Sequence, residues 1–127
     1  MAHRILLVEN EPDQLTTYTE ALEALKFDVV TATSAEEALE RLDQWPDLFA
    51  VLSDLDMGKM PGTEFLLQIS RLRTLLFRVL MSGRIGTDED FDAEVQTASQ
   101  AHIILKKPLS LKLLRQMKQQ LLTMLER

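Results

Sequence analysis

The chain has no cysteine, so disulfide frameworks, thiolate nucleophiles and zinc–thiolate sites are all excluded. Glycine and proline are scarce, at four residues each, and the sequence contains no linker, internal repeat or low-complexity segment. Long hydrophobic runs are missing too, since none approaches the roughly 20 apolar residues of a membrane-spanning helix. Residues 1–4 also lack the apolar region of a signal peptide. We therefore expect a cytoplasmic protein with no membrane partner.

Basic residues are also fewer than acidic ones. Twenty acidic residues outnumber fourteen basic ones, and the net charge of −6 argues against direct binding of nucleic acid. What the chain does have is the apolar content of an ordinary globular protein, because 46% of its 127 residues are hydrophobic. This length is too short for two domains, so residues 1–127 are expected to fold as one unit.

Short apolar runs alternate with helical patterns along the whole chain, and a strand comes first. The run from Arg4 to Val8 is almost entirely apolar, as expected for a strand with helices on both faces. Strands are predicted at residues 4–8, 28–32, 48–52, 78–81 and 103–105. Helices are predicted from Pro12, after the caps Ser34, Thr63 and Ser110, and over residues 88–97. This order predicts an α/β fold of five βα units with a doubly wound parallel sheet.

Polar residues follow four of these strands, at the edge where open parallel sheets bind their ligands. They are Glu9 and Asn10 after the first strand, Asp54 and Asp56 after the third, Ser82 after the fourth and Lys107 after the fifth. Carboxylate oxygens in such a pocket suit Mg²⁺, which keeps several waters and shares phosphate oxygens. Each of these residues alone also fits a solvated loop or turn. Their shared position, just after the carboxyl ends of four strands, favours a ligand-binding site.

The carboxylate at Asp54 can act as a nucleophile toward phosphorus and form an acyl phosphate. The metal, Lys107 and the Ser82 hydroxyl would then neutralise or hydrogen-bond the equatorial oxygens, where charge accumulates in phosphoryl transfer. The residues at these strand ends therefore suit phosphoryl transfer to Asp54 in the presence of a bound metal ion.

Four stretches resemble, in order, the receiver domain of two-component response regulators: ILLVENEP, PDLFAVLSDLDMGKMPGTEFL, RVLMSG and ILKKPLS. The resemblance covers essentially the whole chain and implies a flavodoxin-like fold with the strand order 2-1-3-4-5. It assigns roles to six residues: Asp54 as the phosphoacceptor, Ser82 as the hydroxyl, Lys107 as the lysine before a proline that is usually cis, Glu9 and Asn10 as the acidic pair, and Asp56 as the donor of a backbone carbonyl to Mg²⁺. Asp54 would also bind the metal.

The resemblance implies a domain that accepts a phosphoryl group from a histidine kinase or a phosphotransfer protein and then alters its partner surface. Such a domain catalyses its own phosphorylation and dephosphorylation and is not an enzyme with a separate substrate. The output would pass to a downstream protein or to a C-terminal output domain, because the last predicted helix ends without a glycine or asparagine cap. Phosphorylation-dependent dimerisation is a further expectation.

The chain departs from the family pattern close to the site. Asn10, the only asparagine, stands where a second acid is usual, so the affinity for Mg²⁺ is expected to fall by about 1 to 3 kcal/mol. Gly58 replaces a usual proline, Ile104 replaces the aromatic switch residue, and the segment after Ser82 is longer than usual. These changes favour an altered signalling face around the fourth predicted helix.

Two other functions fit the same residues. The first is a degenerate receiver that binds partners without phosphorylation, which Asn10, Gly58 and Ile104 support. The second is a phosphatase, because SDLDMG resembles the Asp-x-Asp motif of haloacid-dehalogenase-type enzymes, in which the second acid, here Asp56, protonates the leaving group. That motif usually follows the first strand, and the chain has little room for a cap, so the phosphatase is the weaker alternative.

Overall fold

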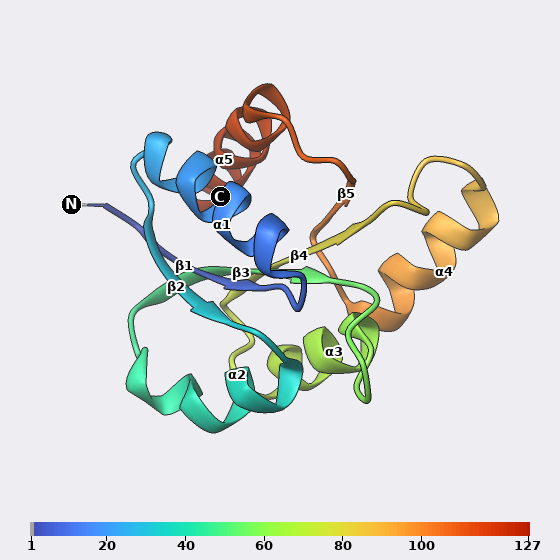
Figure 1. Ribbon diagram of the computed structural model, residues 1–127, viewed down its shortest axis with the longest axis horizontal. Coiled ribbons are helices and arrows are strands. Elements are labelled where there is room, and N and C mark those ends of the chain that lie inside the picture. Colours follow the sequence, from blue (N-terminus) through green and yellow to red (C-terminus); the bar gives the residue numbers. More distant parts are fainter. Residues whose placement is uncertain (1) are drawn as a thin grey trace.

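Five parallel strands form one sheet between two layers of helices (Figure 1). The computed structural model describes residues 2–127. The strands are β1 (Arg4–Val8), β2 (Asp28–Ala32), β3 (Leu48–Asp54), β4 (Phe77–Ser82) and β5 (Ile103–Lys106). The helices are α1 (Pro12–Ala24), α2 (Ala35–Arg41), the 3-10 turn η1 (Leu42–Gln44), α3 (Gly62–Leu72), α4 (Glu89–Ser99) and α5 (Leu111–Leu125). The order β2-β1-β3-β4-β5 confirms the predicted fold class and strand order.

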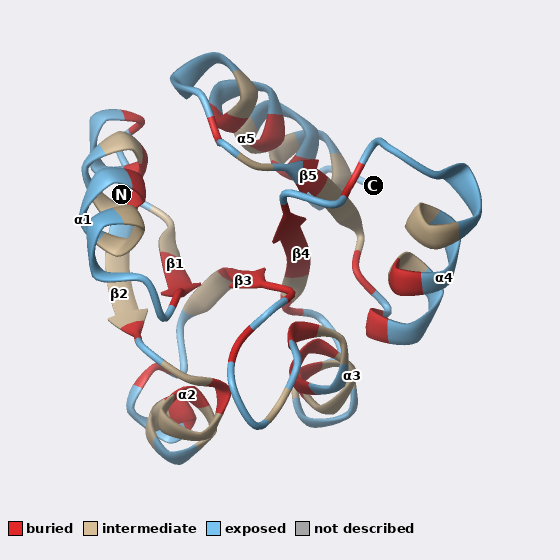
Figure 2. Ribbon diagram, turned by 45° about the vertical axis from the view of Figure 1, so that its right-hand side comes forward, coloured by how far each residue is buried: buried red, intermediate tan, exposed pale blue. Residues whose placement is uncertain are grey.

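Helices α1 and α5 cover one face of the sheet, and α2, α3 and α4 cover the other (Figure 1). The position of β1 between the two helix layers explains why its sequence is almost entirely apolar. Ile5 and Leu7 belong to the core under α1 and α5, whereas Leu6 and Val8 belong to the core under α2 and α3. All four side chains are fully buried, and Figure 2 shows the same concentration of burial on the central strands and on the inward sides of the helices.

Side-chain caps begin two of the helices as predicted. Ser34 Oγ accepts a hydrogen bond from the Glu37 N–H at 3.0 Å, at the start of α2. Ser110 Oγ accepts one from the Leu113 N–H at 3.0 Å, at the start of α5. Each cap satisfies an N–H group that has no partner within its own helix, which fixes where the helix begins.

The cap predicted at Thr63 is wrong. Helix α3 begins at Gly62, with Pro61 in the cap position and no side-chain cap hydrogen bond. The Gly62 N–H donates to the Leu55 carbonyl at 2.8 Å, and a Cβ at Gly62 would overlap the carbonyl oxygen of Asp54. Because glycine alone permits this approach, the contact between α3 and the end of β3 sets the start of the helix.

Three strands run further toward the predicted site than the sequence pattern indicated. Strand β3 ends at Asp54, β4 at Ser82 and β5 at Lys106, whereas the pattern placed these ends at residues 52, 81 and 105. Asp54 still pairs with Met81 in the sheet, because backbone pairing continues where the apolar run stops. The candidate acceptor and hydroxyl therefore lie on strands and not in loops.

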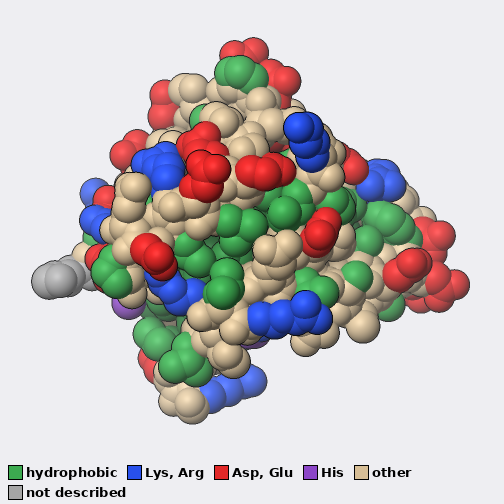
Figure 3. Space-filling view, turned by 90° about the horizontal axis from the view of Figure 1, so that it is seen from below, with side chains coloured by type: hydrophobic (Ala, Val, Ile, Leu, Met, Phe, Trp, Pro, Cys, Tyr) green, Lys and Arg blue, Asp and Glu red, His purple; other side chains and the backbone are tan. Residues whose placement is uncertain are grey.

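The surface over α2 and α3 shows hydrophobic side chains in its middle and charged side chains around them (Figure 3). Within the described residues, the large hydrophobic side chains that are exposed are Leu72, Leu75, Leu111 and Leu125. No helix in residues 2–127 combines the length and the apolar content that crossing a membrane would need.

Candidate functional site

Three residues at the ends of β1, β3 and β5 meet at one edge of the sheet. Lys107 Nζ lies 2.6 Å from Glu9 Oε1 and 3.3 Å from Asp54 Oδ2. The Glu9 side chain is fully buried, and those of Asp54 and Lys107 are only 10% and 13% exposed. The structure thus brings together three of the six residues that the sequence predicted, and one ammonium group bridges two carboxylates.

The position of Lys107 depends on the backbone as well as on its charge. Its N–H donates to the Ser82 carbonyl oxygen at 3.0 Å, and the peptide bond to Pro108 is cis. Glu9 is held in a similar way, because its Oε2 accepts a hydrogen bond from the Glu11 N–H at 3.3 Å. Each side chain is therefore oriented by the strand end from which it projects.

Burial and the neighbouring charges shift the pKa values of Asp54 and Lys107. Burial, together with the nearby charge of Glu9, raises the pKa of Asp54 to about 6, although Lys107 works against this shift. Burial alone would lower the pKa of Lys107, but its hydrogen bond to Glu9 and the charge of Asp54 outweigh burial and raise that pKa. At neutral pH the site therefore holds a charged lysine beside an ionised Asp54.

Ser82 reaches the same edge as the last residue of β4 and is almost fully buried. Its Oγ accepts a hydrogen bond from the Arg84 N–H at 3.1 Å. No hydrogen bond joins Ser82 Oγ to Asp54 within residues 2–127. In the register of β3 and β4, Asp54 pairs with Met81, so Ser82 lies one residue beyond the partner of Asp54 on the neighbouring strand.

The other two predicted residues lie at the exposed mouth of the site. The Asn10 side chain is exposed. The Asp56 carboxylate forms an ion pair with Arg84, at 2.9 Å between Oδ1 and Nη2, and both side chains are largely exposed. The Asp56 side chain therefore has a partner outside the Glu9–Asp54–Lys107 cluster, and the predicted role of this residue concerned only its backbone carbonyl.

Two further cations contact this edge of the sheet, and the sequence pattern did not place Arg84 there. Arg84 lies two residues after Ser82 at the end of β4, and this closeness in the sequence is the only feature that could have predicted its position at the site. Lys106 is exposed, and its Nζ donates to the carbonyl oxygens of Gly83 and Ile85 at 3.4 and 3.2 Å. It thereby ties the end of β5 to the loop that follows β4.

The oxygen atoms at this edge suit a hard divalent cation. Asp54 and Glu9 offer carboxylates, Asn10 an amide oxygen and Asp56 a backbone carbonyl, which is the ligand chemistry of Mg²⁺. Among residues 2–127, no three histidine or acidic side chains gather closely enough to form a metal cluster by themselves. The donor set thus fits Mg²⁺, with less negative charge than a site built from three acids.

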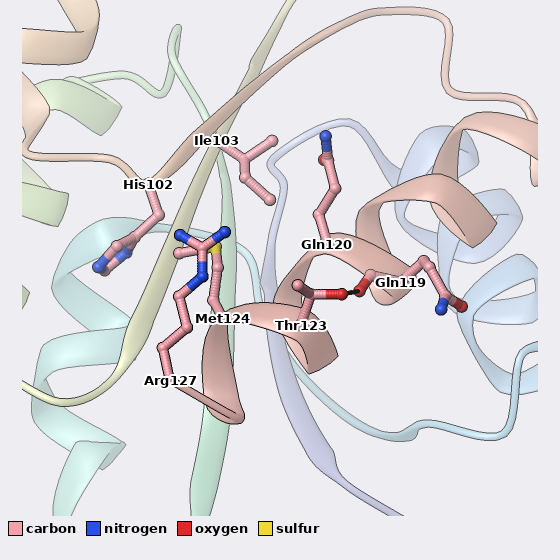
Figure 4. A pocket seen from close by; sticks show the side chains of 7 residues that line it. All are labelled: His102, Ile103, Gln119, Gln120, Thr123, Met124 and Arg127. Atoms are coloured by element: carbon pink, nitrogen blue, oxygen red, sulfur yellow. Dashed lines mark hydrogen bonds between the residues drawn. The ribbon is translucent and has the colours of Figure 1, made fainter.

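A pocket lies at the other end of the sheet, and Figure 4 shows its lining. It is a shallow pocket of about 320 Å³ lined by His102, Ile103, Gln119, Gln120, Thr123, Met124 and Arg127. Thr123 Oγ1 donates to the Gln119 carbonyl within α5, and His102 Nδ1 accepts from the Arg78 N–H at 3.0 Å. These contacts are structural, and the pocket contains no residue of the Glu9–Asp54–Lys107 cluster.

Comparison with known proteins identifies the family of the chain. Residues 5–119 match the family model described as the response regulator receiver domain. The chain belongs to this family. It is 33% identical over 111 residues to the alkaline phosphatase synthesis transcriptional regulatory protein PhoP of Bacillus subtilis, a match that covers 87% of this chain and 44% of that protein. The receiver chain therefore spans less than half the length of this relative.

Solved structures share the fold at lower identity. The receiver domain of a CheY-like protein from Methanospirillum hungatei is 24% identical and aligns with a TM-score of 0.82 over 95% of this chain and 94% of its own. CheY4 of Vibrio cholerae is 20% identical, with a TM-score of 0.85 over 95% and 99% of the two chains. A two-component response regulator from Clostridium difficile is 17% identical, with a TM-score of 0.86 over 98% and 99%. Neither alternative function is favoured by these likenesses.

Proposed function

We propose that this receiver domain accepts a phosphoryl group on Asp54 from the phosphohistidine of a histidine kinase or a phosphotransfer protein. The observation that carries this proposal is the position of Lys107 Nζ, 2.6 Å from Glu9 and 3.3 Å from Asp54. An ammonium group shared by two carboxylates has a third N–H donor to offer to an incoming phosphoryl oxygen.

The transfer needs only one bond to form and one to break. An oxygen of the Asp54 carboxylate donates an electron pair to phosphorus, and the bond between phosphorus and the donor's imidazole nitrogen breaks. The electron pair of that bond stays on the imidazole, which leaves as a neutral ring when its other nitrogen carries a proton. The protein contributes position and charge, as is general for phosphoryl transfer.

The residues around Asp54 supply that charge. Lys107 remains protonated because its pKa is raised, so it can neutralise a phosphoryl oxygen without a proton transfer. Ser82 presents a hydroxyl from the neighbouring strand, and a hydroxyl can donate to a second oxygen. Asp54 must be ionised to act as a nucleophile, and its pKa of about 6 allows this at neutral pH.

Mg²⁺ would be held by Glu9, Asn10, Asp54 and the backbone carbonyl of Asp56. When bound, it supplies Lewis-acid neutralisation of phosphoryl oxygens. Asn10 brings an amide oxygen where a carboxylate would bring a charge, so we expect this domain to bind the ion more weakly than a site with a third acid. The modified domain would then act on a downstream protein or on an output domain of a longer chain.

Incubation with a small phosphodonor and Mg²⁺ tests the proposal. Intact-mass spectrometry should find one added phosphoryl group on the wild type, and hydroxylamine should remove it because the product is an acyl phosphate. Asp54→Asn should gain none, whereas the matched control Asp43→Asn, an exposed acid in η1, should behave like the wild type. A wild type that gains nothing, or an adduct of equal yield on Asp54→Asn, would overturn the proposal.

A further inference from the structure

Arg84 connects three parts of the molecule at the mouth of the site. Its N–H donates to Ser82 Oγ at 3.1 Å, and its Nη2 donates to Asp56 Oδ1 at 2.9 Å. Its guanidinium carbon also stands 5.0 Å from the centre of the Phe91 ring, in the first turn of α4. Through its backbone N–H and its side chain, Arg84 thus contacts the end of β4, the loop after β3 and the start of α4.

The ion pair that holds Arg84 is weak. The Arg84 and Asp56 side chains are 58% and 66% exposed, so water solvates both charges and the pair contributes little to stability. The neighbouring residues 86–90 are exposed as well. The guanidinium can therefore leave Asp56 at small cost when a stronger anionic partner is present nearby.

A phosphoryl group on Asp54 would be such a partner. It brings more negative charge than the carboxylate it replaces and three acceptor oxygens, which a guanidinium can bind through two parallel N–H donors. Lys107 is already shared by Glu9 and Asp54, and Asn10 leaves the metal site with one charge fewer than an acid would give. A second cation would therefore neutralise negative charge of the phosphoryl group that Lys107 and the metal site leave uncompensated.

We propose that Arg84 is a further phosphoryl-binding residue of this domain, held by Asp56 before modification and transferred to the phosphoryl oxygens afterwards. This inference rests on the function proposed above. The transfer would draw the guanidinium away from the Phe91 ring, so the start of α4 would sense the change directly. This coupling between the phosphoryl group and α4 does not need the aromatic switch residue on β5, which is Ile104 in this chain.

Binding of beryllofluoride, a mimic of the phosphoryl group, tests the inference in the presence of excess Mg²⁺. Arg84→Gln should weaken binding by about tenfold, because a charged hydrogen-bond donor is lost. Asp56→Asn should tighten binding by about threefold, since it frees Arg84 from its competing partner. In the double variant Arg84→Gln/Asp56→Asn, the affinity for beryllofluoride should be as low as in Arg84→Gln alone. A merely structural ion pair predicts the opposite for Asp56→Asn, namely weakening in both single variants.

Amide NMR spectra of the same samples provide the second readout. Beryllofluoride should shift the signals of Phe91 and the first turn of α4 in the wild type, and much less in Arg84→Gln at saturating ligand. Equal affinity of Arg84→Gln and the wild type, or weaker binding by Asp56→Asn, would overturn the inference and leave the proposed function standing. A wild type that binds no beryllofluoride and forms no adduct on Asp54 would overturn both.

Discussion

Lys107 and Glu9 are 98 residues apart in the sequence, and 2.6 Å separates Lys107 Nζ from Glu9 Oε1. The Glu9 side chain is fully buried, and that of Lys107 is 13% exposed. A carboxylate removed from water in this way loses much hydration free energy, which its ion pair must offset. The pair therefore makes stability depend on both partners together.

Removal of the lysine charge should reveal this dependence. Lys107→Met leaves Glu9 buried without its cation and should lower the free energy of unfolding by about 3 to 5 kcal/mol. Glu9→Gln combined with Lys107→Met should recover part of the loss, because the fully buried charge of Glu9 is then removed and only Asp54 lacks its cation. Urea denaturation of the wild type, both single variants and the double variant gives the coupling free energy. Strictly additive effects of the two substitutions would contradict a paired, buried interaction.

The site residues could be predicted because strand ends are visible in the sequence. The apolar run of β1 stops at Glu9, and the run of β3 is followed by Asp54, so the sheet edge that carries both was predictable. The ion pair of Arg84 with Asp56 was not, since a long exposed side chain has many partners within reach. The start of α3 at Gly62 was missed for another reason, because it depends on a tertiary contact with β3 that no local pattern encodes.

Stability should depend on pH through Asp54. Its pKa is raised from 3.8 to about 6, so the folded protein binds this proton more tightly than the unfolded chain. Stability is therefore lost as the pH rises from about 4 to about 6, and the loss is complete above that range. Asp54→Asn removes the ionisable group and should stabilise the protein by about 1 to 2 kcal/mol at pH 7.5, because solvent screening reduces the full effect of the pKa shift.

Urea denaturation at pH 4 and at pH 7.5 measures this effect. The two proteins should be nearly equal in stability at the lower pH and differ at the higher one. The control Asp43→Asn alters an exposed carboxyl and should leave the pH profile of the wild type unchanged. A stabilisation by Asp54→Asn that is the same at both pH values would show that ionisation of Asp54 is not its cause.

Gly62, at the start of α3, and Gly83, directly after β4, should respond differently to an added methyl group. A Cβ at Gly62 would overlap the backbone carbonyl of Asp54, whereas a Cβ at Gly83 would meet nothing within 4 Å. Gly62→Ala should therefore destabilise the fold by about 1 to 3 kcal/mol or more, because backbone atoms must move. Gly83→Ala should be neutral or slightly stabilising, since alanine restricts the unfolded chain. Thermal unfolding of both variants checks this, and equal melting temperatures would contradict the close approach at Gly62.

Asn10 should set the affinity of the domain for divalent cations. Asn10→Asp restores a negative charge to an exposed position beside Glu9 and should tighten Mg²⁺ binding by about 1 to 3 kcal/mol, because a charged oxygen ligand replaces a neutral one. Calorimetric titration with Mg²⁺ measures the change, and line broadening by Mn²⁺ locates the ion near Asp54. Thr16→Asp adds the same charge to an exposed position on α1 and should have a much smaller effect, because Thr16 is not one of the predicted oxygen ligands of the metal. If neither the wild type nor Asn10→Asp responds to the metal, these oxygen atoms do not form a magnesium site.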